Sequence, residues 1–237
     1  MEKKKISVKE VAAAIDHSLL RSDLTVKELI DGCALAKQYG CVSVCIYPAG
    51  VGIAKRELAG SDVLVTTVAS FPHGTATTES KVFEAKDAVE KGSVEVDMVM
   101  NYARLLSGEY DYVRDEIAAV AQAVHAGGAL LKVIFENHYL TDDQIIKSCE
   151  LCKQAGADFI KTSTGYAPSG ATIHDLELMV RHAEGMRVKA AGGVKTLDEA
   201  LEVIATGTER IGTRCSKEIL EEATAREQRG ELFLTLK

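Results

Sequence analysis

The chain lacks several features that mark whole classes of protein. Its 237 residues contain no tryptophan, only three prolines and no apolar run long enough to cross a membrane, so no membrane-spanning helix or membrane partner is expected. The basic residues 1–5 are not followed by the apolar segment of a signal peptide, and we therefore expect a cytoplasmic protein. The formal charge of −7 leaves no basic excess to neutralise phosphates, which argues against nucleic acid as a partner.

Metal-ligand and redox patterns are also sparse. The six histidines show no His-x-His pair, so we expect no metal site, and a metal-dependent hydrolase is a distant alternative. One Cys-x-x-Cys pair, Cys149 and Cys152, falls in the late part of a predicted helix, and no second pair faces it. We expect reduced, buried thiols there in preference to a zinc or redox centre.

A single pattern repeats along the chain. A short run of β-branched residues is followed by a loop with glycine, proline, serine or threonine, and then by an amphipathic helix. Eight such units predict an α/β fold of the (β/α)₈ TIM-barrel type in one domain, 1–237. A doubly wound open sheet is the alternative, but its usual GxGxxG turn is absent. The predicted strands are Ala14–Ser18, Val42–Ile46, Val63–Ala69, Val94–Met100, Leu130–Phe135, Phe159–Thr162, Arg187–Ala190 and Arg210–Gly212.

Helix start and stop signals lie between these strands. Thr25 with Glu28 has the spacing of a capping box, and Gly40 is placed to end that helix. Similar signals bound two further helices, Thr141–Gly156 and Thr196–Gly207. Residues 8–13 are expected to form a short helix at the barrel floor, and residues 226–237 a tail that is charged and then apolar.

Ionisable residues interrupt five of the predicted strands, although an all-parallel strand is normally a near-continuous apolar run. A salt bridge at the barrel rim would explain any single one, but five together indicate a shared site. Lys161 and Lys189 fall near the ends of adjacent strands, which lie about 4.8 Å apart. If both point into the barrel mouth, repulsion and burial favour the neutral form of one amine, the form that attacks a carbonyl. The other three residues are Asp16, Asp97 and Lys132.

Side-chain alternation bears on whether Asp97 joins this site. Asp97 has the same parity as Glu95 and Asn101, whereas Met98 and Met100 have the other. If Asp97 points inward, it can meet the lysines across the mouth. The five ionisable groups then carry two negative and three positive charges, and one neutral lysine balances them.

The loops after the last three predicted strands read TSTGYAPSG, AGGVKT and GTRCS. Glycine lets backbone N–H groups approach an anion closely, and the following helix N-terminus adds partial positive charge. Barrel enzymes often bind phosphate with the loops after strands 7 and 8. A single glycine pair could be a simple turn, but three such loops beside two lysines predict a phosphate site. The candidates are Gly165, Gly192, Gly193, Lys195, Gly212 and Arg214.

At these segments the chain resembles the deoxyribose-phosphate aldolase family. FIKTSTGY is similar to its Schiff-base motif, with Lys161 matching the imine-forming lysine. VKAAGGVKT is similar to its second-lysine and phosphate segment, with Lys189 matching the lysine that adjusts the first. VEVDMVMN resembles the segment whose aspartate, here Asp97, relays protons. IDHSLL, VCIYP, SFPHG and LKVIFE extend the similarity over nearly all of residues 14–220.

The resemblance implies a class I aldolase that reversibly cleaves 2-deoxy-D-ribose 5-phosphate into D-glyceraldehyde 3-phosphate and acetaldehyde. The imine on Lys161 is itself the electron sink, so no metal or organic cofactor is expected. The implied partners are the phosphosugar substrate and further copies of the chain, in a homodimer or higher homo-oligomer. Substrate contacts are implied for Asp16, Cys45, Lys132 and Thr164.

Two departures from the family pattern stand beside two alternatives. The family usually has GTSS or GASS after the eighth strand, where this chain has GTRCS, so Arg214 is expected to alter the phosphate contact. The tail to Lys237 has no tyrosine to help proton transfer, which leaves that task to water and Asp97. The alternatives are a lysine-dependent barrel aldolase acting on a ketose phosphate and a non-catalytic barrel that binds a phosphosugar.

Overall fold

Eight parallel strands close into a barrel in the computed structural model, which describes residues 2–236 and the side chains of residues 3–235. The strands follow one another around the barrel in chain order, and the last pairs with the first. They are β2 (Ile15–Leu19), β3 (Ser43–Ile46), β4 (Leu64–Ala69), β5 (Glu95–Val99), β6 (Leu130–Ile134), β7 (Phe159–Lys161), β8 (Arg187–Ala191) and β9 (Arg210–Thr213). The predicted barrel is confirmed, and each predicted strand ends within one residue of the observed one.

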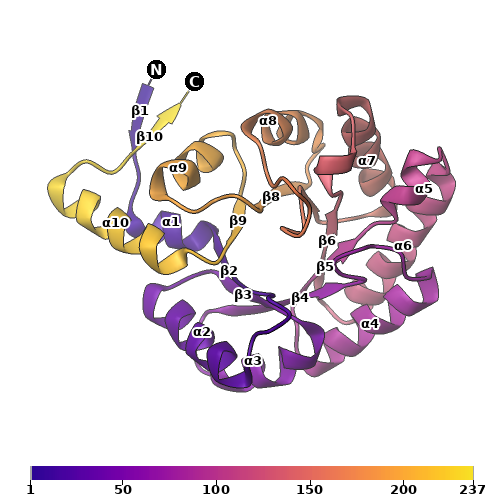
Figure 1. The fold of residues 1–237 in the computed structure, drawn as a ribbon, viewed down its shortest axis with the longest axis horizontal. Coiled ribbons are helices and arrows are strands. Elements are labelled where there is room, and N and C mark those ends of the chain that lie inside the picture. Colours follow the sequence, from indigo (N-terminus) through magenta and orange to yellow (C-terminus); the bar gives the residue numbers. More distant parts are fainter. Residues whose placement is uncertain (1, 237) are drawn as a thin grey trace.

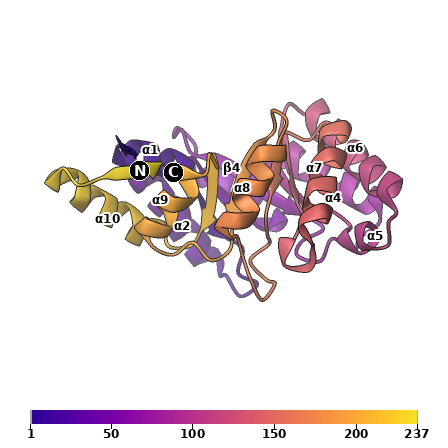
Figure 2. The same ribbon diagram turned by 90° about the horizontal axis from the view of Figure 1, so that it is seen from above.

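Helices surround the barrel, as Figure 1 shows, and Figure 2 shows the same layer from above. Three of them begin with the capping box that their sequence indicates, because Thr25, Thr141 and Thr196 each exchange hydrogen bonds with the residue three positions on. None of the described helices is long and apolar enough to span a membrane. The longer helices are α2 (Val26–Tyr39), α4 (Thr78–Lys91), α6 (Tyr110–Ala126), α7 (Asp142–Ala155), α8 (Ile173–His182), α9 (Leu197–Ala205) and α10 (Ser216–Arg229).

Short helical segments complete the connections. They are α1 (Val8–Ala14), α3 (Val51–Glu57), α5 (Tyr102–Leu106) and the 3₁₀ turns η1 (Pro48–Gly50) and η2 (Asn137–Tyr139). The α1 helix packs against α9, α10 and β9. The backbone N–H of Val42, just before β3, donates to Ala12 O, which places α1 at the N-terminal end of the strands.

The two chain ends form a second sheet that the sequence did not predict. β1 (Glu2–Lys5) pairs antiparallel with β10 (Phe233–Leu236), and both extend beyond the ring of helices in Figure 1. The expected tail at 226–237 therefore begins inside α10 and ends in a strand; Lys237 lies outside the described residues. Pairing with β1 satisfies the backbone there, and Leu232 and Leu234 are buried, which explains the apolar composition of this segment.

The Cys-x-x-Cys pair lies in the late part of α7, as predicted, and both thiols are free and buried. Burial raises the pKa of Cys149 to about 12 and that of Cys152 well above its usual value. Thiols held protonated in this way pack as small apolar groups and are poor nucleophiles.

Candidate active site

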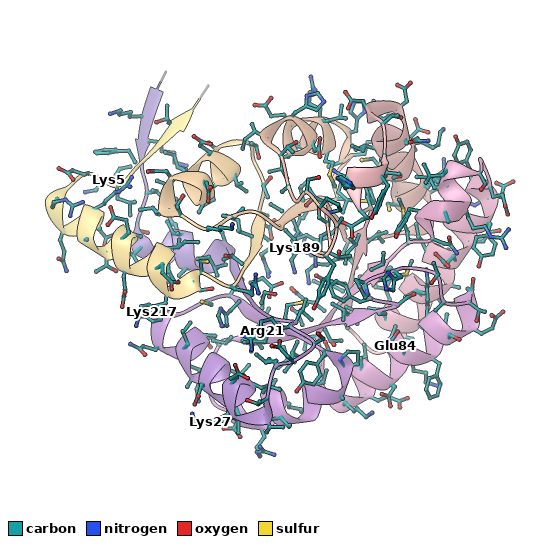
Figure 3. All side chains as sticks on the ribbon, in the orientation of Figure 1. Lys5, Arg21, Lys27, Glu84, Lys189 and Lys217 are labelled. Atoms are coloured by element: carbon teal, nitrogen blue, oxygen red, sulfur yellow. The ribbon has the colours of Figure 1, made fainter. Side chains whose placement is uncertain are left out.

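The strand register brings the charged residues of the barrel together. In the parallel ladder, Asp97 of β5 lies beside Lys132 of β6, and Lys161 of β7 lies beside Lys189 of β8. Asp16 of β2 lies beside Gly212 of β9, where a Cβ would lie 3.5 Å from Lys189 Cε. Neighbouring parallel strands are about 4.8 Å apart, so inward-pointing side chains at these positions meet inside the barrel. Figure 3 shows Lys189 near the centre of the ring, whereas Lys27 lies at its periphery.

Asp97 is the centre of this group. Its Oδ2 accepts hydrogen bonds from Lys161 Nζ and from Lys189 Nζ, each at 2.7 Å. The two amine nitrogens are therefore separated by at most twice that distance. Lys189 Nζ also donates to Asp16 Oδ2. The four side chains are almost completely buried, which strengthens the electrostatic interactions among them.

The two lysines differ in their carboxylate partners. Burial lowers the pKa of Lys189, but the charges of Asp16 and Asp97 outweigh burial and raise that pKa well above its usual value. Burial likewise raises the pKa of Asp97, yet three lysines hold it well below its usual range. Lys189 therefore stays an ammonium beside an ionised Asp97. Of the two neighbouring amines, Lys189 is the one with two carboxylate partners, whereas Lys161 contacts Asp97.

A second layer of charges lies beneath this centre. Lys132 Nζ donates to Asp97 Oδ1 at 2.9 Å and contacts Glu95 Oε2 at 2.5 Å. Glu95 also accepts hydrogen bonds from Thr66 Oγ1 at 3.0 Å and from the Arg210 guanidinium at 3.4 Å. With Glu95 and Arg210 included, the barrel holds three carboxylates and four cations. The net charge of this group becomes zero when one lysine is neutral. The same holds for the two carboxylates and three lysines counted from the sequence.

A cavity of about 370 Å³ opens above the lysines at the C-terminal end of the strands. Lys161 and Lys189 form part of its inner wall, and Cys45 and Thr164 also line it. Cys45 Sγ lies 3.9 Å from Asp97 Oδ2, and burial raises the pKa of this thiol to about 12. This thiol is therefore held protonated, which makes it a poor nucleophile.

Three other candidates for direct contact do not line this cavity. Asp97, Asp16 and Lys132 are not among the residues that line it. Asp97 contacts the lining residues Lys161, Lys189 and Cys45. The sequence placed Asp16 and Lys132 among the substrate-binding residues. In the structure Asp16 contacts Lys189, and Lys132 contacts Asp97.

The three glycine-containing loops meet on one side of the cavity. Gly192 has φ of +79°, and a Cβ built on it would lie 2.9 Å from Gly170 Cα, so a side chain at this position would force the loops apart. The Ala171 N–H donates to the carbonyls of Ala191 and Gly192 at 3.1 and 3.0 Å, which joins the loops after β7 and β8. All the predicted phosphate residues line the cavity: Gly165, Gly192, Gly193, Lys195, Gly212 and Arg214.

Asp16, Cys45 and Asp97 are the described residues that could together hold a metal ion, since their ligand atoms lie within 4.8 Å of one another. Lys189 Nζ, however, already donates to both carboxylates. The ammonium thus supplies the positive charge that a cation would bring, and these carboxylates have an evident partner without a metal.

Comparison with known proteins bears on the family of this chain. A family model described as DeoC/LacD family aldolase matches residues 10–220. The chain belongs to this aldolase family. It is 47% identical over 224 residues to a deoxyribose-phosphate aldolase of Caldanaerobacter subterraneus subsp. tengcongensis, covering 94% of this chain and 97% of the relative. It is also 47% identical to a deoxyribose-phosphate aldolase of Thermococcus gammatolerans, over 90% of this chain and 96% of that one.

Solved structures give the same result. A putative deoxyribose-phosphate aldolase from Coccidioides immitis matches with a TM-score of 0.90 and 40% identity, over 93% of this chain and 88% of the other. The deoxyribose phosphate aldolase from Aeropyrum pernix, whose structure is described as tetrameric, matches with a TM-score of 0.84 and 28% identity, over 92% of this chain and 93% of the other.

Several residues of this aldolase site were not predicted from the sequence. Arg21, from the loop after β2, lines the cavity mouth and pairs with Asp23 and Glu28. Tyr166 lies in the loop after β7 and also lines the cavity. Its hydroxyl donates to Leu20 O at 2.7 Å, which joins the loops after β2 and β7 across the mouth. These residues follow no pattern along the chain, and only barrel closure brings their loops together.

Proposed function

We propose that this protein is a class I aldolase that reversibly cleaves 2-deoxy-D-ribose 5-phosphate into D-glyceraldehyde 3-phosphate and acetaldehyde. The observation that carries this proposal is the arrangement at Asp97, where Lys161 and Lys189 share one carboxylate oxygen at the base of the cavity and two carboxylates raise the pKa of Lys189. The names of the relatives point to the same substrate.

The reaction begins with attack of the neutral Lys161 amine on the C1 aldehyde of the open-chain sugar. Loss of water gives a protonated imine, which withdraws electrons from the adjacent carbons. The C3 hydroxyl then loses its proton, the C2–C3 bond breaks, and D-glyceraldehyde 3-phosphate leaves. The bonding electrons form an enamine of acetaldehyde on Lys161. Protonation at C2 and addition of water to the imine release acetaldehyde and restore the amine.

Charge at the base of the cavity supports each step. The Lys189 ammonium, close to Lys161, favours the neutral form of the attacking amine through repulsion. Asp97 is ionised, because three lysines hold its pKa well below the usual range. In this ionised form it accepts hydrogen bonds from Lys161 and Lys189, and in the proposed cycle it relays protons between these groups, bound water and the substrate. Asp16 holds Lys189 in place, and Lys132 holds Asp97 in place.

The upper part of the cavity suits the phosphate. Backbone N–H groups of the glycine loops can approach its oxygens, and Lys195 and Arg214 add positive charge at the exposed rim. Cys45 and Thr164 lie on the cavity wall, where the carbon chain between the imine and the phosphate would pass.

We further propose that the protein acts as a homo-oligomer in the cytoplasm. The described tetramer of the Aeropyrum pernix relative supports assembly. Light scattering with size-exclusion chromatography should give a mass that is a multiple of the 25.5 kDa chain; a monomer at micromolar concentration would contradict this part of the proposal.

The substrate assignment is tested by a donor panel. With D-glyceraldehyde 3-phosphate as acceptor, acetaldehyde should be consumed and dihydroxyacetone phosphate should not, and EDTA should leave the rate unchanged. Preference for dihydroxyacetone phosphate would instead indicate an aldolase for ketose phosphates. Phosphosugar binding without turnover of either donor would indicate a sensor, and loss of activity with EDTA would contradict the metal-free mechanism.

A further inference from the structure

The loop after β6 is bound to the loop after β7 by a series of hydrogen bonds. The Phe135 N–H donates to Lys161 O and the Asn137 N–H donates to Thr162 O, both at 3.0 Å. These bonds continue the β6–β7 ladder past the ends of the strands. Glu136 lies between the two donors, so its position is fixed relative to the reactive lysine and the residues that follow it.

Glu136 has two features that call for an explanation. Its backbone is left-handed, with φ of 59° and ψ of 62°, a conformation that is uncommon and costly for a residue other than glycine. Its side chain is 2% exposed, and buried carboxylates are rare unless their oxygens are satisfied. This backbone turns the carboxylate toward the loop after β7.

Both carboxylate oxygens of Glu136 bind a single residue, Thr164. Oε1 accepts from the Thr164 N–H at 3.1 Å, and Oε2 is bonded to Thr164 Oγ1. Thr164 Oγ1 also accepts from the Tyr166 N–H at 3.0 Å. Three hydrogen bonds therefore hold Thr164 in place. Thr164 lines the cavity, and the next residue in the chain is Gly165, a candidate phosphate residue.

Counting donors and acceptors shows what Thr164 can offer a ligand. A hydroxyl has one proton and two lone pairs, and an ionised carboxylate only accepts. The hydroxyl proton of Thr164 is therefore committed to Glu136, and one lone pair is occupied by the Tyr166 N–H. The remaining lone pair is the only hydrogen-bonding capacity left to the hydroxyl. Toward the cavity, Thr164 is an acceptor and requires a donor.

We propose that Glu136 is a positioning residue that fixes the Thr164 hydroxyl as a hydrogen-bond acceptor, and so makes the enzyme select substrates with a donor hydroxyl at C4. This inference rests on the proposed function. C1 is bonded to Lys161 and the C5 phosphate lies among the glycine loops. Thr164 lines the same cavity as Lys161 and Gly165, and in the proposed arrangement the carbon next to the phosphate-bearing one lies against its hydroxyl.

The test uses acetaldehyde as donor and two acceptors that differ only at the carbon which becomes C4. D-Glyceraldehyde 3-phosphate carries a hydroxyl there, and the second acceptor carries a fluorine, which is of similar size but has no proton to donate. The native enzyme should prefer the first in kcat/KM by roughly tenfold, the effect of one hydrogen bond of about 1.5 kcal/mol. In Glu136→Gln the side-chain amide can donate to Thr164 Oγ1 and release the threonine proton toward the cavity. The preference should then fall to about twofold or less.

Glu184→Gln is the matched control, because Glu184 also has a left-handed backbone (φ 47°) but is exposed and precedes β8 at the opposite end of the barrel. Its preference should equal that of the native enzyme. An unchanged preference in Glu136→Gln, or an equal loss with both acceptors, would overturn the proposal, because the second outcome marks a merely structural role.

Borohydride trapping with acetaldehyde alone separates this inference from the proposed function. If the native enzyme traps no acetaldehyde, the aldolase proposal itself fails. If it does trap acetaldehyde and Glu136→Gln does not fold, the native enzyme still tests the acceptor role of Thr164 through the fluorinated acceptor. The KM for this acceptor should rise severalfold; a KM equal to that of D-glyceraldehyde 3-phosphate would overturn the inference.

Discussion

Replacing Lys189 with methionine tests the electrostatic basis of the site. The substitution keeps a long, flexible side chain and removes the positive charge that shares Asp97 Oδ2 with Lys161. The pKa of Lys189 is raised well above its usual value, with Asp16 and Asp97 as the principal cause against the opposing effect of burial. The charge is therefore present in the native enzyme throughout the neutral range, and the variant lacks it at every pH.

The expected size of the effect follows from the separation of the two nitrogens. At about 5 Å and an effective dielectric constant of about 20, two unit charges repel by ~3 kcal/mol. Without this repulsion the neutral form of the attacking amine is disfavoured by a similar amount, which corresponds to roughly a hundredfold lower rate of imine formation at pH 7. Asp16 also loses its ammonium partner, so the free energy of unfolding should fall by about 3–5 kcal/mol.

The assay measures the rate at which acetaldehyde and borohydride modify the protein between pH 6 and pH 10. Lys189→Met should be about a hundredfold slower than the native enzyme at pH 7 and should approach it as the pH rises, since hydroxide restores the neutral amine. Circular dichroism at each pH confirms that the variant is folded. Lys195→Met is the control: it removes an exposed lysine from the same cavity, and trapping by an aldehyde without phosphate should not change.

Two outcomes would refute this reasoning. A variant that traps acetaldehyde as fast as the native enzyme at pH 7 would show that the neighbouring charge does not matter. A variant that stays slow at every pH while remaining folded would show that Lys189 acts through some property other than its charge.

Two further predictions concern the rim and the outer layer. Arg214→Ala should raise the KM for the phosphosugar much more than it lowers kcat, because a contact remote from the reacting bond contributes mostly uniform binding; an unchanged KM would exclude Arg214 from the phosphate site. Burial lowers the pKa of Lys81 and raises that of Glu116, which lie 2.9 Å apart as a fully buried pair. Lys81→Met should therefore lower the free energy of unfolding in urea by about 3 kcal/mol, whereas Lys86→Met, exposed on the same helix, should change it by less than about 0.5 kcal/mol; equal effects would contradict this.

Much of the barrel could be predicted because its signals are local. Each strand is a short apolar run bounded by turn residues, and the capping boxes at Thr25, Thr141 and Thr196 mark helix starts within four residues of sequence. The β1–β10 sheet has no such signal. Its strands are separated by nearly the whole chain, and the EKKK segment has no apolar alternation to indicate a strand.

The site could be predicted in part for the same reason. Lys161 and Lys189 end consecutive strands, so their proximity follows from the order of the barrel. Which lysine keeps its charge depends on carboxylates from β2 and β5, and no pattern along the chain reports those distances. Glu95 shared the parity of Asp97 and could have been included. Arg210 could not, because its contact with Glu95 exists only across the closed barrel.

The left-handed backbone at Glu136 shows a further limit of sequence patterns. Glycine is the residue that usually marks such a conformation, and here a glutamate adopts it. The segment LKVIFE predicts a strand that ends at Phe135 and resembles the aldolase family, but nothing in it marks Glu136 as a left-handed residue. The contact with Thr164 that gives this glutamate its proposed role joins two loops 28 residues apart in the chain.

Peptide mass mapping after treatment with acetaldehyde and borohydride tests the central claim most directly. We expect one ethyl group per chain, on the tryptic peptide that contains Lys161, and none on the peptide that contains Lys189. Modification of Lys189 in place of Lys161, or no modification of either, would contradict the assignment of Lys161 as the nucleophile.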